Sequence, residues 1–221
     1  MKSIENSERS ALVLGTGGEA RVVISLLRSL GYRIHGLLDC KEYREGEVIS
    51  GVSVVGNASD VSSWTDTLGG PSVFLAIGNN EERASWYQFC KSAGLNTPSI
   101  IARSSSVDDS AELGEANIVC EQAHVGSECF IGNNNIINSG AIVEHESMIG
   151  DHVHCAPSST VCGRSKLGDL CFLGASSVVI EGLELAAKTT LGAGAVLVDS
   201  VTETGLTMLG IPAKPKTNDR A

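Results

Sequence analysis

Apolar residues recur at every sixth position across the second half of the chain, from Val107 to Leu197. All sixteen positions in this series hold an apolar residue or cysteine. Because 42% of the chain is hydrophobic, chance would give such a series about once in a million trials. So regular a period indicates repeats that are stabilised by their neighbours. The series is Val107, Leu113, Val119, Val125, Ile131, Ile137, Val143, Ile149, Cys155, Val161, Leu167, Leu173, Val179, Leu185, Leu191 and Leu197.

Small residues and glycines flank the apolar series at fixed offsets. Six residues provide one short strand and one turn, so three repeats would close a triangular coil with one large side chain per side pointing inward. The small residues two places earlier would fit at the corners, and we expect the following glycines to relax the turns. The small residues are Ala111, Ala123, Cys129, Ala141, Ser159, Ser165, Cys171, Ser177 and Ala195. The glycines are Gly114, Gly126, Gly132, Gly150, Gly168, Gly174 and Gly192.

This pattern resembles the hexapeptide-repeat, left-handed parallel β-helix of acyltransferases. The resemblance implies about five coils over residues 107–198. The left hand comes from that family, because general crossover rules favour a right-handed connection.

The chain before the repeat has the pattern of a Rossmann-like α/β domain. An apolar run at Ala11–Leu14 leads into a glycine turn at 15–20, a helix over Arg21–Leu30 and a strand ending at Asp39. This order is typical of nucleotide-binding βαβ units, in which the turn glycines let the backbone approach a phosphate. Asp39 is placed to accept a hydrogen bond from a ribose or a base. Ala20 replaces the third glycine of the dinucleotide fingerprint, which disfavours NAD, and a tight turn without a ligand remains an alternative.

The remaining elements of the first domain are shorter. Asn79 or Asn80 is a candidate N-cap for a helix that ends near Ala93, and Arg83 could instead face a phosphate. The other elements are a hairpin at Val48–Val55, a helix at Asp60–Leu68, and strands at Ser72–Ile77 and Ser99–Ile101. We therefore expect an α/β domain over 11–102, the β-helix over 107–198, and a C-terminal loop and tail over 199–221.

Composition narrows the choice of partners. A net charge of −10 argues against nucleic-acid binding, which needs a basic surface. The polar N-terminus and the absence of a long apolar run predict a cytoplasmic protein without a membrane partner. The seven cysteines form no C-x-x-C pair, and five of them lie in the repeat. They are interpreted as packing residues, and no metal site is predicted.

The polar residues best suited to catalysis lie around His145. It lies two residues after the inward Val143 and is flanked by Glu144 and Glu146. A carboxylate beside an imidazole fixes its tautomer and increases its basicity, and histidine suits proton removal near neutral pH. In a straight strand Glu146 would point away from His145, so their contact requires a corner between them. An ordinary surface histidine is the alternative.

Several motifs occur together in an order that is similar to the sugar O-/N-acyltransferases typified by bacillosamine and perosamine N-acetyltransferases and sialic acid O-acetyltransferases. The resemblance covers about residues 11–214. The motifs are the glycine turn, Ile77-Gly78-Asn79-Asn80 with Arg83, Asn138, Glu144-His145-Glu146, His154 and Gly210-Ile211-Pro212-Ala213-Lys214.

The resemblance implies a homotrimeric enzyme that transfers an acetyl group from acetyl-CoA to a nucleotide-linked amino sugar by direct attack in a ternary complex. His145 would be the general base, Glu146 would support it, and Asn138 would help to position the site. His154 would lie near the thioester, with Ala175 and Ala193 lining a CoA groove between neighbouring β-helices. The nucleotide-sugar candidates are Gly17, Gly18, Glu19, Asp39, Cys40, Asn79 and Arg83. Glu19 and Cys40 depart from the family pattern, which leaves the nucleotide and the sugar open.

Three other functions fit parts of the pattern. O-acetylation of a sugar hydroxyl needs the same base. A metal-dependent hydratase like the γ-class carbonic anhydrases needs three histidines that converge across a subunit interface. A non-catalytic scaffold that binds a sugar nucleotide needs only the first domain's site.

Overall fold

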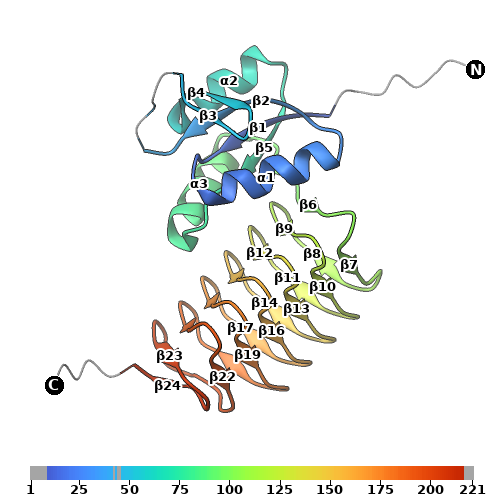
Figure 1. Cartoon of the computed structure of the whole chain (residues 1–221), viewed down its shortest axis with the longest axis vertical. Coiled ribbons are helices and arrows are strands. Elements are labelled where there is room, and N and C mark those ends of the chain that lie inside the picture. The colour runs from blue at the N-terminus through green and yellow to red at the C-terminus, as the bar shows by residue number, and fades with distance from the viewer. Residues whose placement is uncertain (1–8, 42, 44–45, 217–221) are drawn as a thin grey trace, which may run out of the picture. The chain divides into compact units, whose positions relative to one another are not determined.

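The computed structural model describes residues 9–41, 43 and 46–216, which form two compact units (Figure 1). The first unit contains the chain up to Gly78 together with Ser85–Pro98, and the second contains Asn79–Ala84 and the chain from Ser99 onward. Residues 1–8 and the end of the predicted tail, 217–221, lie outside the described residues. The predicted fold class, a Rossmann-like domain followed by a parallel β-helix, is confirmed.

The first unit is built on a five-stranded sheet in the order β3-β4-β2-β1-β5. Its strands are parallel except for β3, which forms the predicted hairpin with β4. The strands are β1 (Ser10–Leu14), β2 (Arg33–Asp39), β3 (Val48–Ile49), β4 (Val52–Asn57) and β5 (Ser72–Leu75). The helices are α1 (Gly18–Ser29), the short 3-10 helix η1 (Ala58–Asp60), α2 (Val61–Thr67) and α3 (Asn80–Ser92), whose first turn belongs to the second unit.

The second unit is a β-helix whose strands form three sheets, here called sheets I, II and III in the order in which the chain visits them. Sheet I contains β6 (Ile100–Ile101), β9 (Ile118–Val119), β12 (Ile136–Ile137), β15 (His154–Cys155), β18 (Phe172–Leu173), β21 (Thr190–Leu191), β23 (Thr207–Leu209) and β24 (Lys214–Pro215). Sheet II contains β7 (Ser106–Val107), β10 (His124–Val125), β13 (Ile142–Val143), β16 (Thr160–Val161), β19 (Val178–Val179) and β22 (Val196–Leu197). Sheet III contains β8 (Glu112–Leu113), β11 (Phe130–Ile131), β14 (Met148–Ile149), β17 (Lys166–Leu167) and β20 (Glu184–Leu185).

The sixfold series supplies the core of this unit. Each strand pairs in parallel with the strand one coil later, as His124 and Val125 do with Ile142 and Val143. Every member of the series is buried except the first two, Val107 and Leu113, which are partly buried. One apolar residue per side therefore fills the coil, as the period predicts.

The role predicted for the glycines is wrong. The left-handed conformation occurs three residues after every inward residue except the first and the last, usually at a non-glycine residue such as Glu146 (φ 58°) or Arg164 (φ 60°). The glycines that directly follow the inward residues do not adopt it. A Cβ atom on Gly168 would lie 2.6 Å from the backbone nitrogen of Ala187 in the next coil. These glycines therefore permit close stacking of the coils and do not relax the turns.

Both predicted boundaries of the β-helix differ from those of the structure. The strand expected to close the first domain, β6, pairs with β9 and belongs to the β-helix. The segment expected to be a C-terminal loop contains β23, which pairs with β21, and β24, which pairs with β23. Strands of two or three residues are too short to show an alternation of their own in sequence, so pattern alone does not reveal them.

Replacing Gly168 with alanine should destabilise the chain by about 1–3 kcal/mol, because the new methyl group overlaps the next coil. The control is Gly194→Asn. Gly194 has φ 67° and open space where a Cβ atom would lie, and Asn134 adopts the same conformation at the equivalent position of an earlier repeat. We expect Gly194→Asn to change the stability by less than about 0.5 kcal/mol. Urea unfolding measures both, and equal losses would contradict the stacking role.

Candidate active site

The predicted nucleotide-binding residues of the first unit gather where β1 and β2 end. Gly17 is the N-cap of α1 and Gly18 is its first residue, so the backbone N–H groups of the helix start here. Asp39 ends β2 and is largely buried. One carboxylate oxygen accepts a hydrogen bond from the Thr16 hydroxyl (3.0 Å), and the other accepts one from the Lys41 backbone N–H (2.8 Å). Asp39 is thus held in place beside the glycine turn.

Three other predicted residues have local roles in the structure. Glu19 lies in the first turn of α1, where a carboxylate interacts favourably with the helix dipole. Cys40 directly follows β2 and is half-buried. Asn79 caps α3, because its side-chain oxygen accepts a hydrogen bond from the Glu82 N–H (2.9 Å). Asn79 therefore has the N-cap role that its sequence position also allowed.

Arg83 does not have the geometry of a phosphate ligand. Only 1% of it is exposed. Its guanidinium donates hydrogen bonds to the backbone oxygens of Asn134 (3.1 Å), His152 (3.0 Å) and Val153 (3.3 Å), and to the side-chain oxygen of Asn80 (2.9 Å). These carbonyls belong to successive corners between sheets III and I. Arg83 therefore satisfies buried backbone groups of the β-helix.

His145 and Glu146 form the predicted pair, at the corner between β13 and β14. The left-handed conformation of Glu146 turns its side chain back toward the imidazole, and Nδ1 of His145 lies 3.0 Å from its carboxylate. The corner required by the sequence argument is therefore present. The hydrogen bond from His145 and, to a lesser extent, the Arg164 guanidinium lower the pKa of Glu146, so it stays ionised at neutral pH.

The orientation of the imidazole is fixed by two contacts. A carboxylate only accepts hydrogen bonds, so Nδ1 donates and Nε2 keeps its lone pair. The ring also lies against Gly163 in the next coil, where a Cβ atom would come within 2.6 Å of Cε1 and Nε2. Nε2 makes no hydrogen bond with any residue in the described part of the chain. The exposed nitrogen is thus available as a proton acceptor.

Asn138 and His154 form a second polar pair at a different corner. The Asn138 side-chain nitrogen lies 3.2 Å from Nε2 of His154, whose ring packs edge-on against Phe172 with centroids 5.2 Å apart. Asn138 precedes β13, whereas His145 follows it. The seven-residue separation spans about 20 Å of extended chain. Within one chain, therefore, Asn138 and His154 are brought together, but they are not brought to His145 and Glu146.

Ala175 and Ala193 lie exposed at the same corner as Asn138, one coil apart. The Gly194 N–H donates a hydrogen bond to the Ala175 carbonyl (2.9 Å), which stacks the two turns directly. Two exposed, small side chains therefore lie in one column of the β-helix.

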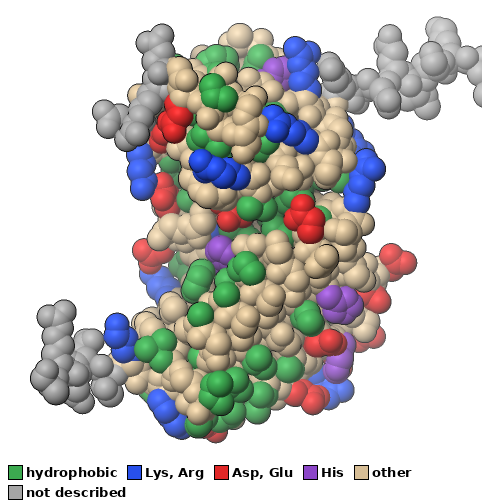
Figure 2. Space-filling view, in the orientation of Figure 1, with side chains coloured by type: hydrophobic (Ala, Val, Ile, Leu, Met, Phe, Trp, Pro, Cys, Tyr) green, Lys and Arg blue, Asp and Glu red, His purple; other side chains and the backbone are tan. Residues whose placement is uncertain are grey.

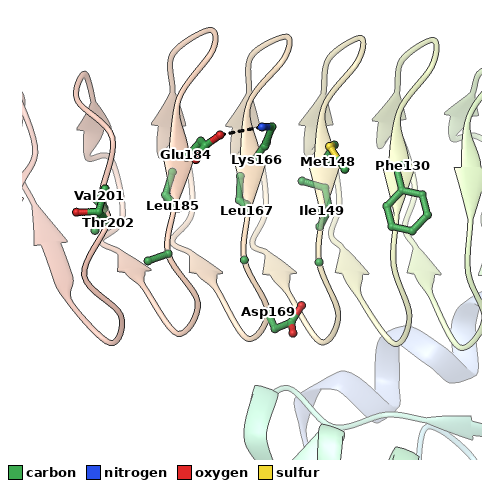
Figure 3. Close-up of a pocket in the computed structure, with 13 residues that line it drawn as sticks. Phe130, Met148, Ile149, Lys166, Leu167, Asp169, Glu184, Leu185, Val201 and Thr202 are labelled. Carbon is green, nitrogen blue, oxygen red and sulfur yellow. Dashed lines mark hydrogen bonds and ion pairs between the residues drawn. The ribbon is translucent and has the colours of Figure 1, made fainter.

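One groove in the β-helix is lined by other residues. It lies over sheet III, has a volume of about 480 Å³ and runs from Phe130 past Met148 to Val201 (Figure 3). The ion pair between Lys166 and Glu184 (2.8 Å) lies across it. None of the predicted site residues lines this groove.

No three His, Cys, Asp or Glu side chains among the described residues are grouped to hold a metal ion. Cys129, Cys155 and Cys171 are buried at their predicted packing positions, and burial raises the pKa of Cys155 to about 12. No helix in the described ranges is long and apolar enough to cross a membrane. On the face in Figure 2, Lys and Arg side chains are scattered and form no continuous stripe.

Comparison with known proteins agrees with the two-part architecture. Residues 10–89 match the family described as the PglD N-terminal domain. PerB from Caulobacter crescentus, solved in complex with CoA and GDP-perosamine, is 32% identical, with a TM-score of 0.87 over 94% of this chain and 97% of that one. The acetyltransferase domain of PglB from Neisseria gonorrhoeae, in complex with acetyl coenzyme A, is 27% identical, with a TM-score of 0.87 over 95% and 100%. No curated protein sequence matches the chain.

The chain belongs to the hexapeptide-repeat sugar acetyltransferases. A similarity of more than 30% identity over nearly the full length of both chains decides this. WeeI from Acinetobacter baumannii, at 22% identity and a TM-score of 0.81, shares the fold. In this acetyltransferase the family's fold thus carries two separated polar pairs on one β-helix.

Three residues near His145 were missed by the sequence reasoning: Gly163, Arg164 and Glu181. Gly163 and Arg164 follow His145 and Glu146 by one coil, so they stack directly on them. Adding the length of one coil to the residue numbers of His145 and Glu146 would have identified Gly163 and Arg164. Glu181 pairs with Arg164 (2.7 Å) and lies just beyond the same corner of the next coil.

Replacing Arg83 with methionine should destabilise this acetyltransferase by about 2–4 kcal/mol, because several buried carbonyls lose their donor. The control is Arg28→Met, on the exposed surface of α1, with an expected change below about 0.5 kcal/mol. Thermal or urea unfolding measures both. A phosphate-binding role would instead leave stability unchanged and raise the KM for a nucleotide sugar.

Proposed function

We propose that this protein transfers an acetyl group from acetyl-CoA to the amino group of a nucleotide-linked sugar, with His145 as the general base. The observation that carries the proposal is the oriented imidazole of His145, with its Nδ1 on Glu146 and its Nε2 open. The family supports the donor and acceptor classes. Relatives at 31–32% identity were solved with CoA and GDP-perosamine, including variants in which one histidine was replaced.

The reaction needs little covalent chemistry from the protein. When bound, acetyl-CoA supplies an already activated thioester carbonyl. The sugar amine attacks this carbon, the carbon–sulfur bond breaks, and Nε2 of His145 accepts the proton that the amine loses. Glu146 stabilises the imidazolium that forms, because its carboxylate already accepts the Nδ1 proton. His145 can then return the proton to the departing thiolate.

The two polar pairs suggest that a complete site needs two chains. Asn138 lies at the corner before β13 and contacts His154 in β15, whereas His145 and Glu146 lie at the corner after β13. In a cyclic homotrimer, the second corner of one chain would face the first corner of its neighbour. We infer that Asn138 and His154 of one chain act with His145 and Glu146 of the next.

The remaining predicted residues fit the two substrates. The column of small side chains at Ala175 and Ala193 shares its corner with Asn138 and would line the pantetheine arm of CoA. The glycine turn at Gly17 and Gly18, together with Asp39, would hold the nucleotide, because helix N-terminal N–H groups bind phosphates. Glu19 and Cys40 adjoin this turn and would influence which nucleotide is accepted.

Replacing His145 with asparagine should lower kcat by about 10²–10⁴-fold, the usual contribution of a general base. Free thiol release from acetyl-CoA measures the rate with UDP-, dTDP- and GDP-linked amino sugars. His35→Asn, in the first unit, is the control and should retain wild-type activity. A near-normal rate for His145→Asn would rule out this base. No thiol release by the wild-type protein, despite sugar-nucleotide binding, would favour a scaffold.

Mixed trimers test the shared site. His145→Ala and His154→Ala chains, each inactive alone, should recover about a quarter of wild-type activity after denaturation and reassembly at equal amounts. The estimate follows because three-quarters of random trimers are mixed and each holds one intact site of three. Separately refolded variants, combined without exchange, are the control. No recovery despite confirmed mixed trimers would place all four residues in one chain's site.

A further inference from the structure

Beside the His145–Glu146 pair lies a chain of charges that the acetyl transfer described above does not use. The Glu146 oxygen that contacts His145 also accepts a hydrogen bond from Nε of Arg164 (3.0 Å). The other side of the guanidinium donates to a carboxylate oxygen of Glu181 (2.7 Å). Four side chains from three successive coils therefore form one continuous row in the order His145, Glu146, Arg164 and Glu181.

The coil register makes this row a fixed feature. Arg164 adopts the same left-handed corner conformation as Glu146 (φ 60° and 58°) and lies one coil beyond it. Its backbone N–H donates to the His145 carbonyl (2.9 Å). Because the backbone holds Arg164 against the turn of His145, the guanidinium contacts Glu146 with little loss of side-chain conformational entropy.

We propose that Arg164 is a positioning residue for the base, which holds the Glu146 carboxylate toward His145 and offsets part of its negative charge. The inference rests on the proposed role of His145. A lone carboxylate beside an imidazole favours the imidazolium, which is not a base. The guanidinium offsets that negative charge, while leaving the hydrogen bond that orients the ring. Glu181 in turn offsets part of the charge of Arg164. The opposite charges along the row therefore partly cancel in their effect on His145.

The balance predicts opposite effects from the two ends of the row. Removing Arg164 leaves Glu146 uncompensated, so His145 should take up its proton at a higher pH. Removing Glu181 leaves Arg164 uncompensated, so His145 should take up its proton at a lower pH. If the row had only a structural role, the two substitutions would shift the pH at which His145 takes up its proton in the same direction or not at all. The other ionisable groups of the neighbouring turns are unchanged in both variants: Glu128 in the preceding coil, Glu144 in the same turn and Cys162 in the next.

The experiment follows His145 itself, by NMR titration of the imidazole nitrogens in the whole protein, with His145→Asn to assign the signal. Arg164→Gln should move its titration midpoint up by roughly 0.3–0.7 pH unit, the effect of one exposed ion pair. Glu181→Gln should move it down by a smaller amount. Gln122 occupies the corresponding corner position with φ 60°, so glutamine is compatible with the backbone of Arg164. The controls are Lys166→Gln and Glu184→Gln, an equally exposed pair on sheet III, which should leave the midpoint in place.

The acid limb of the kcat/KM profile should move in parallel. Arg164→Gln should then lose activity at pH 6–7 and recover it at high pH, because only the fraction of neutral base has changed. Shifts of equal sign, or no shift, for the two variants would overturn the proposal. The NMR midpoints need no turnover. Opposite midpoint shifts without acetyl transfer would therefore reject the proposed function alone, whereas transfer with unmoved midpoints would reject the role of Arg164.

Discussion

The site depends on one constraint, which is that every coil of the β-helix stacks on the next in strict register. The inward side chains fill the coil, and the glycines behind them let adjacent backbones approach closely. A residue therefore meets its counterpart one coil away with little freedom to shift. This is why Gly163 lies against the ring of His145 and why Arg164 reaches Glu146. A slip of one residue would separate all of these contacts at once.

The corners between strands bring together side chains that a straight strand would keep apart. In a straight strand neighbouring side chains point to opposite faces, so His145 and Glu146 would not meet. The left-handed conformation at Glu146 reverses that direction, and the carboxylate reaches Nδ1. The same conformation recurs at most corners with many kinds of residue, so stacking from both sides must stabilise it. The catalytic candidates thus occupy ordinary scaffold positions and differ from other corners only in side chain.

The sequence was most informative where its pattern repeats. The sixfold series predicted the core of the β-helix, and the strand–turn–helix order predicted β1, α1 and β2. Single residues were harder to interpret. The position of Arg83 after a strand and an N-cap suits both a phosphate ligand and a buried donor, and only its contacts with three corner carbonyls distinguish the two. Likewise, Asn138 and His145 are near in sequence, but β13 holds them apart.

The separation of Asn138 from His145 links the proposed activity to the assembly of several chains. If one chain holds both halves of the machinery at opposite ends of β13, it holds no complete site by itself. The first unit, with its glycine turn and Asp39, could still bind a nucleotide before assembly. Under the proposed function, the β-helix would contribute a base whose ring is already oriented by Glu146 and Gly163, so assembly would have only to bring the second pair to it. Nucleotide binding and acetyl transfer would then belong to different parts of the chain, and the fixed register of the coils would determine how the two polar pairs of neighbouring chains meet.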